Sequence, residues 1–402
     1  MKSEMRHIEQ WLSGMLMLLM LLTACASEST EEPVVPKHKP KLKVYLFAPE
    51  SPIITRADIG QVDASDPKEK SINTLDVWVF EHEAPNHQVS YIHLDNLTFD
   101  GQKEIAMDIS DDFANMPKKP NVDIYVLANK ESCGLITSDD EAADPTTNYN
   151  GKKTLAQLKE AYIGQGYFGV SAPQQTVPDE GLPMSGLLEN QIISGIPPVY
   201  TAMEQPVKLV RAVSKVRFVL SKSSSGAPTI TNLNIKLNEN VIPQEEYLFL
   251  EGVYPTYKSH VKSTGNNDYE AAATLVQGQV NVQPTINACS DPASYAYTTE
   301  TGQAYETKIN DGIGAGELSQ VGLFYLRESH RQLTGTIEYT IGTSPNTENK
   351  SVPFTMAGAG DFTRNHTWIV YGYFLGSGEL KLNVVDVKGW TTGGENQDLY
   401  NW

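Results

Sequence analysis

The 402-residue chain has only three cysteines, at positions 25, 133 and 289. So few thiols exclude a disulfide framework as the source of its stability. We expect Cys133 and Cys289 to be buried thiols, and a single bridge between them is the less favoured alternative. The eight histidines form no cluster with the spacing of metal ligands. The sequence therefore predicts neither a metal site nor a cofactor.

Basic residues are also in short supply. The chain has 31 Lys and Arg against 49 Asp and Glu, which gives a formal net charge of -18. Proteins that bind nucleic acid neutralise phosphates with clustered Lys and Arg, so this balance argues against a nucleic-acid partner. It fits instead a self-repelling extracellular surface.

Motifs of known catalytic chemistry are missing as well. The segment His82-Glu83-Ala84-Pro85-Asn86-His87 resembles a zinc-protease helix, but its histidines are five residues apart and Pro85 interrupts any helix between them. The glycine-rich segment 312–316 lacks the Lys-Ser/Thr of a phosphate loop, and we interpret it as a flexible turn. No Gly-x-Ser-x-Gly elbow occurs. We therefore expect no enzyme, although carboxylates that folding brings together stay open as an alternative.

What the sequence does contain begins with an export signal. An apolar run at residues 11–22 follows a short basic stretch and leads into Leu22-Thr23-Ala24-Cys25. The run is too short to span a bilayer, which needs about 20 residues. Small residues before the cysteine fit cleavage by a signal peptidase. We predict a signal peptide at residues 1–24 and lipidation of Cys25; the alternative is a short membrane anchor with an incidental cysteine.

Period-two alternation of apolar residues predicts a β-rich chain. Order should begin near Lys41, after a polar tether, and in the strand at 72–80 the odd-numbered aliphatic residues should face away from Trp78 and Phe80. One short helix is expected at 154–162. The predicted strands are 41–47, 72–80, 122–129, 207–220, 230–237, 321–326, 335–341, 367–374 and 380–387.

Many short strands with almost no helical periodicity imply β-sandwich domains. About 375 residues remain after the signal peptide, more than one hydrophobic core usually organises, so two domains are expected. A proline-containing break at 198–206 marks the boundary. The expected layout is a signal peptide at 1–24, a tether with the first strand at 25–56, an N-terminal sandwich at 57–205 and a C-terminal sandwich at 206–402.

A series of distinctive segments runs in order along the chain. They are the Leu-Thr-Ala-Cys sequence ending at Cys25, then 54–57, 72–80, 122–130, 182–186, 209–219, 364–368 and 382–390, and a terminal Trp402. Together they resemble the fimbrillin family, the type V pilins of the Bacteroidales. The resemblance implies an all-β fold with minor α content, made of two tandem transthyretin-like Greek-key β-sandwich domains. It also implies export as an outer-membrane lipoprotein that becomes part of an extracellular fimbrium.

The resemblance further implies a route of assembly. In the family an arginine-specific, trypsin-like protease cuts after an Arg behind the first strand, and the groove left by that strand is filled by a C-terminal strand of a neighbouring subunit. In this chain the cut would lie between Arg56 and Ala57, although Arg56 taken alone fits a solvated loop. The donor-strand candidates are Leu380, Leu382, Val384, Val385 and Val387. The alternative for their segment is an ordinary last strand of the second sandwich.

Two functions from different classes fit these features. The first is a structural fimbrial subunit that supports adhesion, with other pilin subunits, the protease and the outer membrane as partners. Its place as shaft, tip or anchor, and any ligand on host or bacterial surfaces, stay open. The second is a monomeric surface lipoprotein that binds glycans or host proteins through sandwich loops. Trp78, Trp368 and Trp390 lie in or next to predicted strands, so no aromatic platform for glycans is visible.

Overall fold

The computed structural model describes most of the chain from residue 39 to residue 387. The described ranges are 39–47, 67–97, 102–133, 154–202 and 206–387, with gaps in the last two at 165, 172, 225, 227, 250–267, 279–283, 301, 344, 357–361 and 363. Pro40–Trp402 forms one compact unit, and the features below lie within it. In the described ranges no helix is long and apolar enough to cross a membrane.

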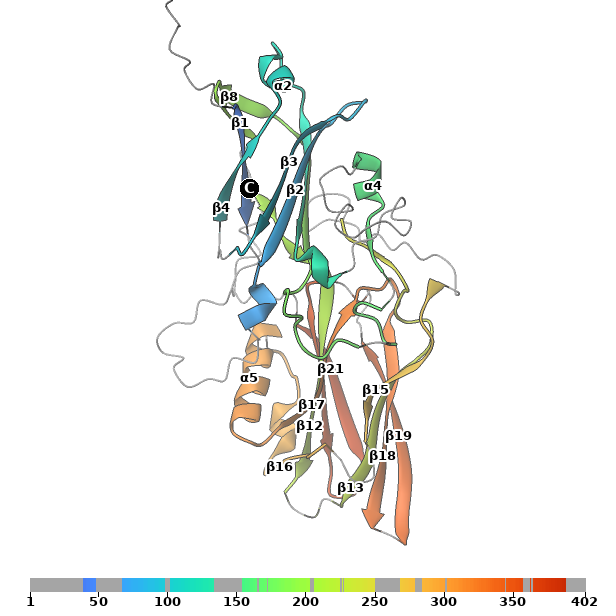
Figure 1. Ribbon diagram of the computed structural model, residues 1–402. Helices are drawn as coiled ribbons and strands as arrows, with labels where there is room; N and C mark the ends of the chain where they lie inside the picture. The colour runs from blue at the N-terminus through green and yellow to red at the C-terminus, as the bar shows by residue number, and fades with distance from the viewer. Residues whose placement is uncertain are drawn as a thin grey trace, which may run out of the picture. The chain divides into compact units, whose positions relative to one another are not determined.

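The fold is all-β with a few short helices, as predicted (Figure 1). The elements up to residue 211 are β1 (Lys41–Phe47), η2 (Pro67–Lys70), β2 (Thr74–Glu81), β3 (Gln88–Asp95), β4 (Gln102–Asp108), α2 (Asp111–Asn115), β5 (Val122–Ala128), η3 (Lys130–Ser132), α4 (Leu155–Lys159), β6 (Tyr162–Ile163), β7 (Met184–Gln191), β8 (Ile193–Ile196), β9 (Val199–Ala202), β10 (Val207–Lys208) and β11 (Val210–Arg211). Those that follow are β12 (Val213–Ser223), β13 (Ile230–Leu237), β14 (Glu246–Tyr247), β15 (Ala273–Gln277), β16 (Ala288–Cys289), η5 (Pro292–Tyr295), α5 (Gly302–Gly314), β17 (Ser319–Arg327), β18 (Leu333–Thr343), β19 (Asn346–Met356), β20 (Thr367–Phe374) and β21 (Leu380–Val387).

Two sheets built from residues up to Arg211 enclose one hydrophobic core. One sheet has the order β10-β1-β9-β8, with β4 also paired to β1, and the other has the order β11-β7-β5-β2-β3. Val77 and Val79 of β2 point into the core between these sheets. Trp78 and Phe80 lie on the opposite face and pack into a separate cluster. The two faces predicted for β2 are thus confirmed.

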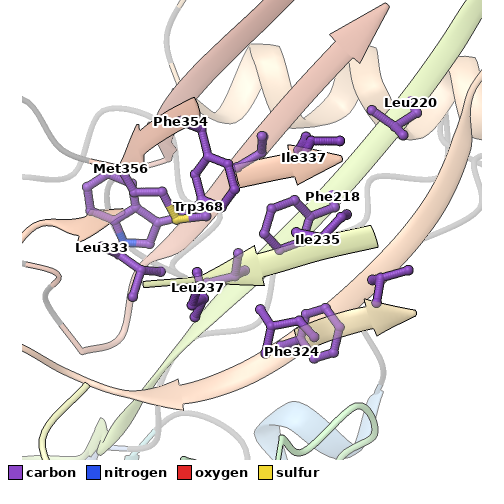
Figure 2. Packing of buried hydrophobic residues seen from close by; sticks show 14 of the residues in the cluster. Phe218, Leu220, Ile235, Leu237, Phe324, Leu333, Ile337, Phe354, Met356 and Trp368 are labelled. Atoms are coloured by element: carbon purple, nitrogen blue, oxygen red, sulfur yellow. The ribbon is translucent and has the colours of Figure 1, made fainter. Parts of the chain in front are cut away.

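Two further sheets, built from residues after Arg211, enclose a second core. One has the order β16-β12-β20-β21 with β17 paired to β12, and the other has the order β15-β13-β18-β19. Figure 2 shows their interdigitated side chains, in which the ring of Phe218 meets that of Phe354 edge-on at 5.6 Å between centroids. Helix α5 packs on the outer face of the first of these sheets through Tyr305 and Ile309.

Several predicted elements are confirmed at their bounds, among them β13, β20 and β21. Helix α4 is shorter than the predicted helix at 154–162, and it begins behind a capping box in which Thr154 and Gln157 each accept a backbone N–H of the other.

The flexible turn predicted at 312–316 is wrong in its first half, because α5 continues through Gly314. Tyr305, Ile309 and Ile313 follow one another at intervals of four residues and pack against the sheet. This packing outweighs the low helix propensity of the glycines.

Candidate functional site

Strand β1 lies inside its sheet and is bonded along both edges. It pairs antiparallel with β4 over its full length, from Lys41 opposite Asp108 to Phe47 opposite Gln102 (Figure 1). On its other edge it runs parallel to β9 and then to β10. We call the place of β1 between β4 on one side and β9 and β10 on the other the β1 slot. Removal of β1 would leave two unpaired strand edges facing this slot.

The inner face of β1 is apolar and fully buried. Leu42, Val44 and Leu46 alternate with outward-facing residues, each is 0% exposed, and all three belong to the first core. Burial of such side chains stabilises a fold by about 1.5–3 kcal/mol each. A subunit without β1 would therefore expose an apolar groove as well as open backbone edges.

The outer face of β1 is polar and centres on Glu104 of β4. The Glu104 carboxylate accepts a hydrogen bond from Lys43 Nζ at 2.9 Å and another from the Tyr45 hydroxyl at 2.9 Å. These two donors lower the pKa of Glu104, and the same carboxylate raises the pKa of Lys43. At the start of the strand Lys41 forms an ion pair with Asp108. Exposed pairs of this kind contribute little to stability, so their main effect is to favour one strand register.

The donor-strand candidates all lie in β21, which is an edge strand. Within the described part of the chain β21 pairs with β20 alone, from Leu380 opposite Phe374 to Val387 opposite Thr367. In this structure the segment is thus the last strand of the second sandwich. An edge strand is held by one ladder of hydrogen bonds, whereas β1 is held by two. Release of β21 from the body breaks fewer backbone hydrogen bonds per residue than release of β1.

The five candidates divide between the two faces of β21. Leu380 is buried in the second core, and Leu382 and Val384 are partly buried against it. Val385 and Val387 pack on the opposite face, in the cluster beneath α5. The sequence alone left open which of these residues share a face of the strand, and the structure shows it.

A buried ionic contact holds the first element after residue 66. Glu69 of η2 is 2% exposed, and its Oε1 lies 2.9 Å from Lys215 Nζ and accepts a hydrogen bond from the Tyr325 hydroxyl at 2.5 Å. The Glu69 carbonyl oxygen accepts a hydrogen bond from Arg211 Nε at 2.8 Å. Glu69 therefore fixes η2, the first described element after the predicted cut at Arg56. Sequence reasoning missed it because its partners lie more than a hundred residues away.

A second buried cluster surrounds Arg364. Its guanidinium group donates through Nε to Glu328 Oε1 at 2.6 Å, and its Nη2 atom lies 3.2 Å from Glu246 Oε1. Burial, followed by the nearby Glu328 carboxylate, raises the pKa of Glu246 well above its ordinary value. Arg211 also donates to Asn365 Oδ1 at 3.2 Å. The segments 209–219 and 364–368, which contribute to the family resemblance, thus supply buried charged contacts and not a surface site.

Other predicted residues have separate outcomes. Cys25, Arg56 and Ala57 lie outside the described residues, so their lipidation and cleavage stay predictions. Cys133 and Cys289 are buried and not bridged to each other, as predicted.

The two tryptophans of the described strands do not form an aromatic platform. Trp78 is 1% exposed and Trp368 is 3% exposed, so neither is available to stack on a glycan. Trp390 lies outside the described residues.

Comparison with known families gives a match to a fimbrial family. Residues 54–208 match the family described as "Major fimbrial subunit protein (FimA)". This match confirms the resemblance to the fimbrillin family. Because that family consists of structural subunits, it also supports the prediction that the chain is not an enzyme. No curated protein sequence gives a significant match.

Comparison with solved structures gives matches over nearly the whole length of both chains. A candidate cell adhesion protein from Parabacteroides distasonis is 15% identical with a TM-score of 0.50, and the match covers 88% of this chain and 98% of that one. A fimbrilin from Porphyromonas gingivalis is 12% identical with a TM-score of 0.44, covering 87% and 97%. The tip fimbrial protein Mfa3 of the same species is 13% identical with a TM-score of 0.45, covering 87% and 99%. The first of these supports the all-β fold.

Proposed function

From the fimbrial-subunit match of residues 54–208, we propose that this chain is a structural subunit of a cell-surface fimbria and polymerises by exchange of its first strand. The observation that carries the proposal is the position of β1 within its sheet. The strand lies between two bonded edges, and its three apolar side chains are completely buried. A sandwich that loses such a strand accepts any well-matched replacement.

The proposal begins with export and trimming. The Leu-Thr-Ala-Cys sequence supports a precursor held in the outer membrane by lipid on Cys25. An arginine-specific, trypsin-like protease then cuts after Arg56. That residue lies between β1 and η2 in sequence, so the cut leaves β1 attached to the fold by noncovalent contacts alone, while Glu69 anchors η2.

Exchange follows when β1 leaves. The C-terminal segment of a neighbouring subunit, which contains the five candidates of β21, enters the slot and restores both hydrogen-bond ladders. The position of β21 at a sheet edge supports this role, because the strand leaves its own body by breaking one ladder. A subunit that both accepts and donates a strand fits the shaft of the fibre, and the fibre in turn supports adhesion.

We further propose that the subunit consists of two transthyretin-like sandwich domains with their boundary at Arg211, beyond the boundary expected between 205 and 206, because β10 and β11 pair with β1 and β7 of the first sandwich. Two observations support this division. The sheets before and after Arg211 share no paired strand except the short β6–β14 contact, among the described residues. Each pair of sheets also has its own core.

The N-terminus of the native surface protein tests the trimming step. Mass spectrometry of the fimbrial fraction should find Ala57 as the first residue. The variant Arg56→Lys keeps the charge but removes the arginine that the protease requires, so it should remain as untrimmed precursor. A mature protein that begins with lipidated Cys25 and is nevertheless assembled into fibres would contradict the proposal.

A further inference from the structure

We infer the register and direction of the donor strand, a conclusion that rests on the proposed function. We propose that Leu380, Leu382 and Val384 of one subunit take the places of Leu42, Val44 and Leu46 in the next. The Glu104 carboxylate of the acceptor subunit then accepts hydrogen bonds from Lys381 and Asn383 of the donor. The donor then runs in the same direction as β1, antiparallel to β4. Three observations carry this inference.

The first observation is the apolar pattern. The slot accepts two leucines and one valine at alternate positions, and these are Leu42, Val44 and Leu46. In the segment 379–402 just one set of three alternate positions is entirely aliphatic. It also has two leucines and one valine, which are Leu380, Leu382 and Val384. The total apolar volume is unchanged, and volume-conserving exchanges are the best tolerated in a packed core. A slip by one residue would turn Lys381 and Asn383 inward.

The second observation is the polar pattern on the outer face. In the free subunit Glu104 accepts hydrogen bonds from Lys43 and Tyr45. In the proposed register Lys381 replaces Lys43 and Asn383 replaces Tyr45, so the carboxylate again faces one ammonium group and one further donor. Glu104 thus becomes a residue that selects the correct donor register.

Asn383 is poorly satisfied in its present position. Its Oδ1 atom in β21 is buried without a hydrogen-bond partner among the residues that the structure describes. A buried polar atom of this kind carries a desolvation cost. In the slot Asn383 would occupy the place of Tyr45, which faces outward and is partly exposed. The exchange therefore moves the Asn383 side chain from a site where its Oδ1 atom is buried without a described partner to a partly exposed site beside Glu104.

The same register has one electrostatic cost. Glu379 takes the place of Lys41 and comes opposite Asp108. The side chains of Lys41 and Asp108 are 45% and 50% exposed in the free subunit, so water and salt screen the repulsion at this position.

The third observation concerns the two ends of the slot. At the Phe47 end, the Phe47 carbonyl accepts from Leu209 N at 3.0 Å, and Arg211 close by is buried against Glu69 and Asn365. This end of the slot is therefore bordered by buried contacts of the same subunit. The Lys41 end meets the turn between β8 and β9, where Lys41 N donates to Pro198 O at 2.8 Å.

The Lys41 end of the slot carries exposed side chains, since those of Lys41 and Asp108 are 45% and 50% exposed. Beside it Ile196, which lies opposite Val199 in the strand next to Lys41, is 79% exposed. A donor that enters here has its own body outside this end, so its N-terminal residue, Leu380, reaches the Leu42 position first. The turn before β21 supports this geometry. It lies at the Phe374–Leu380 end of the β20–β21 ladder, and Thr367 and the Arg364 cluster lie at the other end.

Four cysteine pairs test the register and the direction together. In β1, Lys43 lies opposite Ala106 and Tyr45 lies opposite Glu104. Residues directly opposite in an antiparallel pair have Cα atoms about 4.5–5.5 Å apart, within disulfide range, whereas diagonal neighbours lie about 7–8 Å apart. The pairs K381C with A106C and N383C with E104C should therefore form disulfides between subunits when trimmed protein is assembled and oxidised. The crossed pairs, K381C with E104C and N383C with A106C, are the matched controls.

The expected result is a ladder of covalent oligomers on a non-reducing gel for the first two pairs and none for the crossed pairs. Unassembled protein should give no ladder, and Cys133 and Cys289 are buried and should not contribute. A ladder from the crossed pairs would show that the donor runs in the opposite direction. Fibres without a ladder from any pair would show that the register is wrong. If trimmed wild-type protein forms no fibres, the proposed function itself fails, and the register fails with it.

Discussion

The Nζ atom of Lys215 lies 2.9 Å from the Glu69 carboxylate, and both side chains are almost completely buried. Glu69 belongs to η2, the first described element after the predicted cut, whereas Lys215 belongs to β12 of the second sandwich. The pair therefore joins η2 to a central strand of the second sandwich. Loss of one partner would remove the opposite charge that faces the other in a buried site, which is strongly destabilising.

The first prediction follows from this pair. Glu69→Ala should lower the free energy of unfolding by about 3–5 kcal/mol, because it removes the carboxylate that faces the buried ammonium group of Lys215. Urea unfolding monitored by circular dichroism measures the change. The neighbouring Lys68 forms its ion pair with Asp179 at the surface, so Lys68→Ala is the matched control and should leave the midpoint unchanged. Equal midpoints for the two variants would contradict the anchoring role of Glu69.

The second prediction concerns pH. Burial raises the pKa of Glu246 above its ordinary value of 4.5, so the folded state holds this proton more tightly than the unfolded state does. The resulting stabilisation is fully present below the ordinary pKa and is lost as the pH rises through the folded pKa. The melting temperature should fall across this window, and Glu246→Gln should reduce the slope. Melting curves recorded between about pH 5 and pH 8 measure this fall in melting temperature. If the melting temperature of Glu246→Gln falls as steeply with pH as that of the wild type, another group causes the pH dependence.

The third prediction concerns the accessibility of Arg56. Trypsin at low dose should cut after Arg56 while the rest of the chain stays folded. The released fragment should elute with the body on size exclusion, because two ladders and three buried side chains hold β1, and should separate under denaturing conditions. Arg56→Gln is the control that resists this cut. If residues 1–56 stay covalently attached to a folded body, the exchange model has no trigger.

The fourth prediction separates the two faces of the donor strand. Val384 faces the slot in the proposed register, so Val384→Asp should stop a subunit from donating, since a carboxylate there must either ionise at a large desolvation cost or take up a proton. Val385 faces the opposite way and packs beneath α5 in the free subunit. Val385→Asp should lower the melting temperature yet still permit donation. Light scattering measures fibre growth by the two variants. Fibres from Val384→Asp but none from Val385→Asp would contradict the register.

The sequence predicted most strands well, but the single strand predicted at 207–220 is wrong: this segment is divided into β10, β11 and β12, which pair with β1, β7 and β20 in three different sheets. In β2 the aliphatic and aromatic side chains define two faces, and the structure shows both of them buried, one in each of two clusters. The end residues of β20 and β21 were also predicted correctly, because glycine and serine separate the two strands.

The features that the sequence did not predict depend on contacts between distant residues. Lys215 was interpreted as an ordinary member of an alternating strand, but its side chain is buried and the Glu69 carboxylate reaches it from η2. Helix α5 was missed because glycines at its ends obscure the spacing of Tyr305, Ile309 and Ile313. The role of Glu104 required the pairing of β1 with β4, which no local pattern in either strand specifies.

Assembly with a truncated subunit tests strand exchange most directly. A variant that ends at Gly378 lacks every donor candidate but keeps the β1 slot. After trimming, it should receive a strand from a wild-type subunit and have none to give. Mixed with trimmed wild-type protein in increasing proportion, it should therefore shorten the fibres progressively, as measured by electron microscopy. If trimmed protein lacking residues 379–402 forms fibres as long as those of the full-length protein, the C-terminal strand is not the donor.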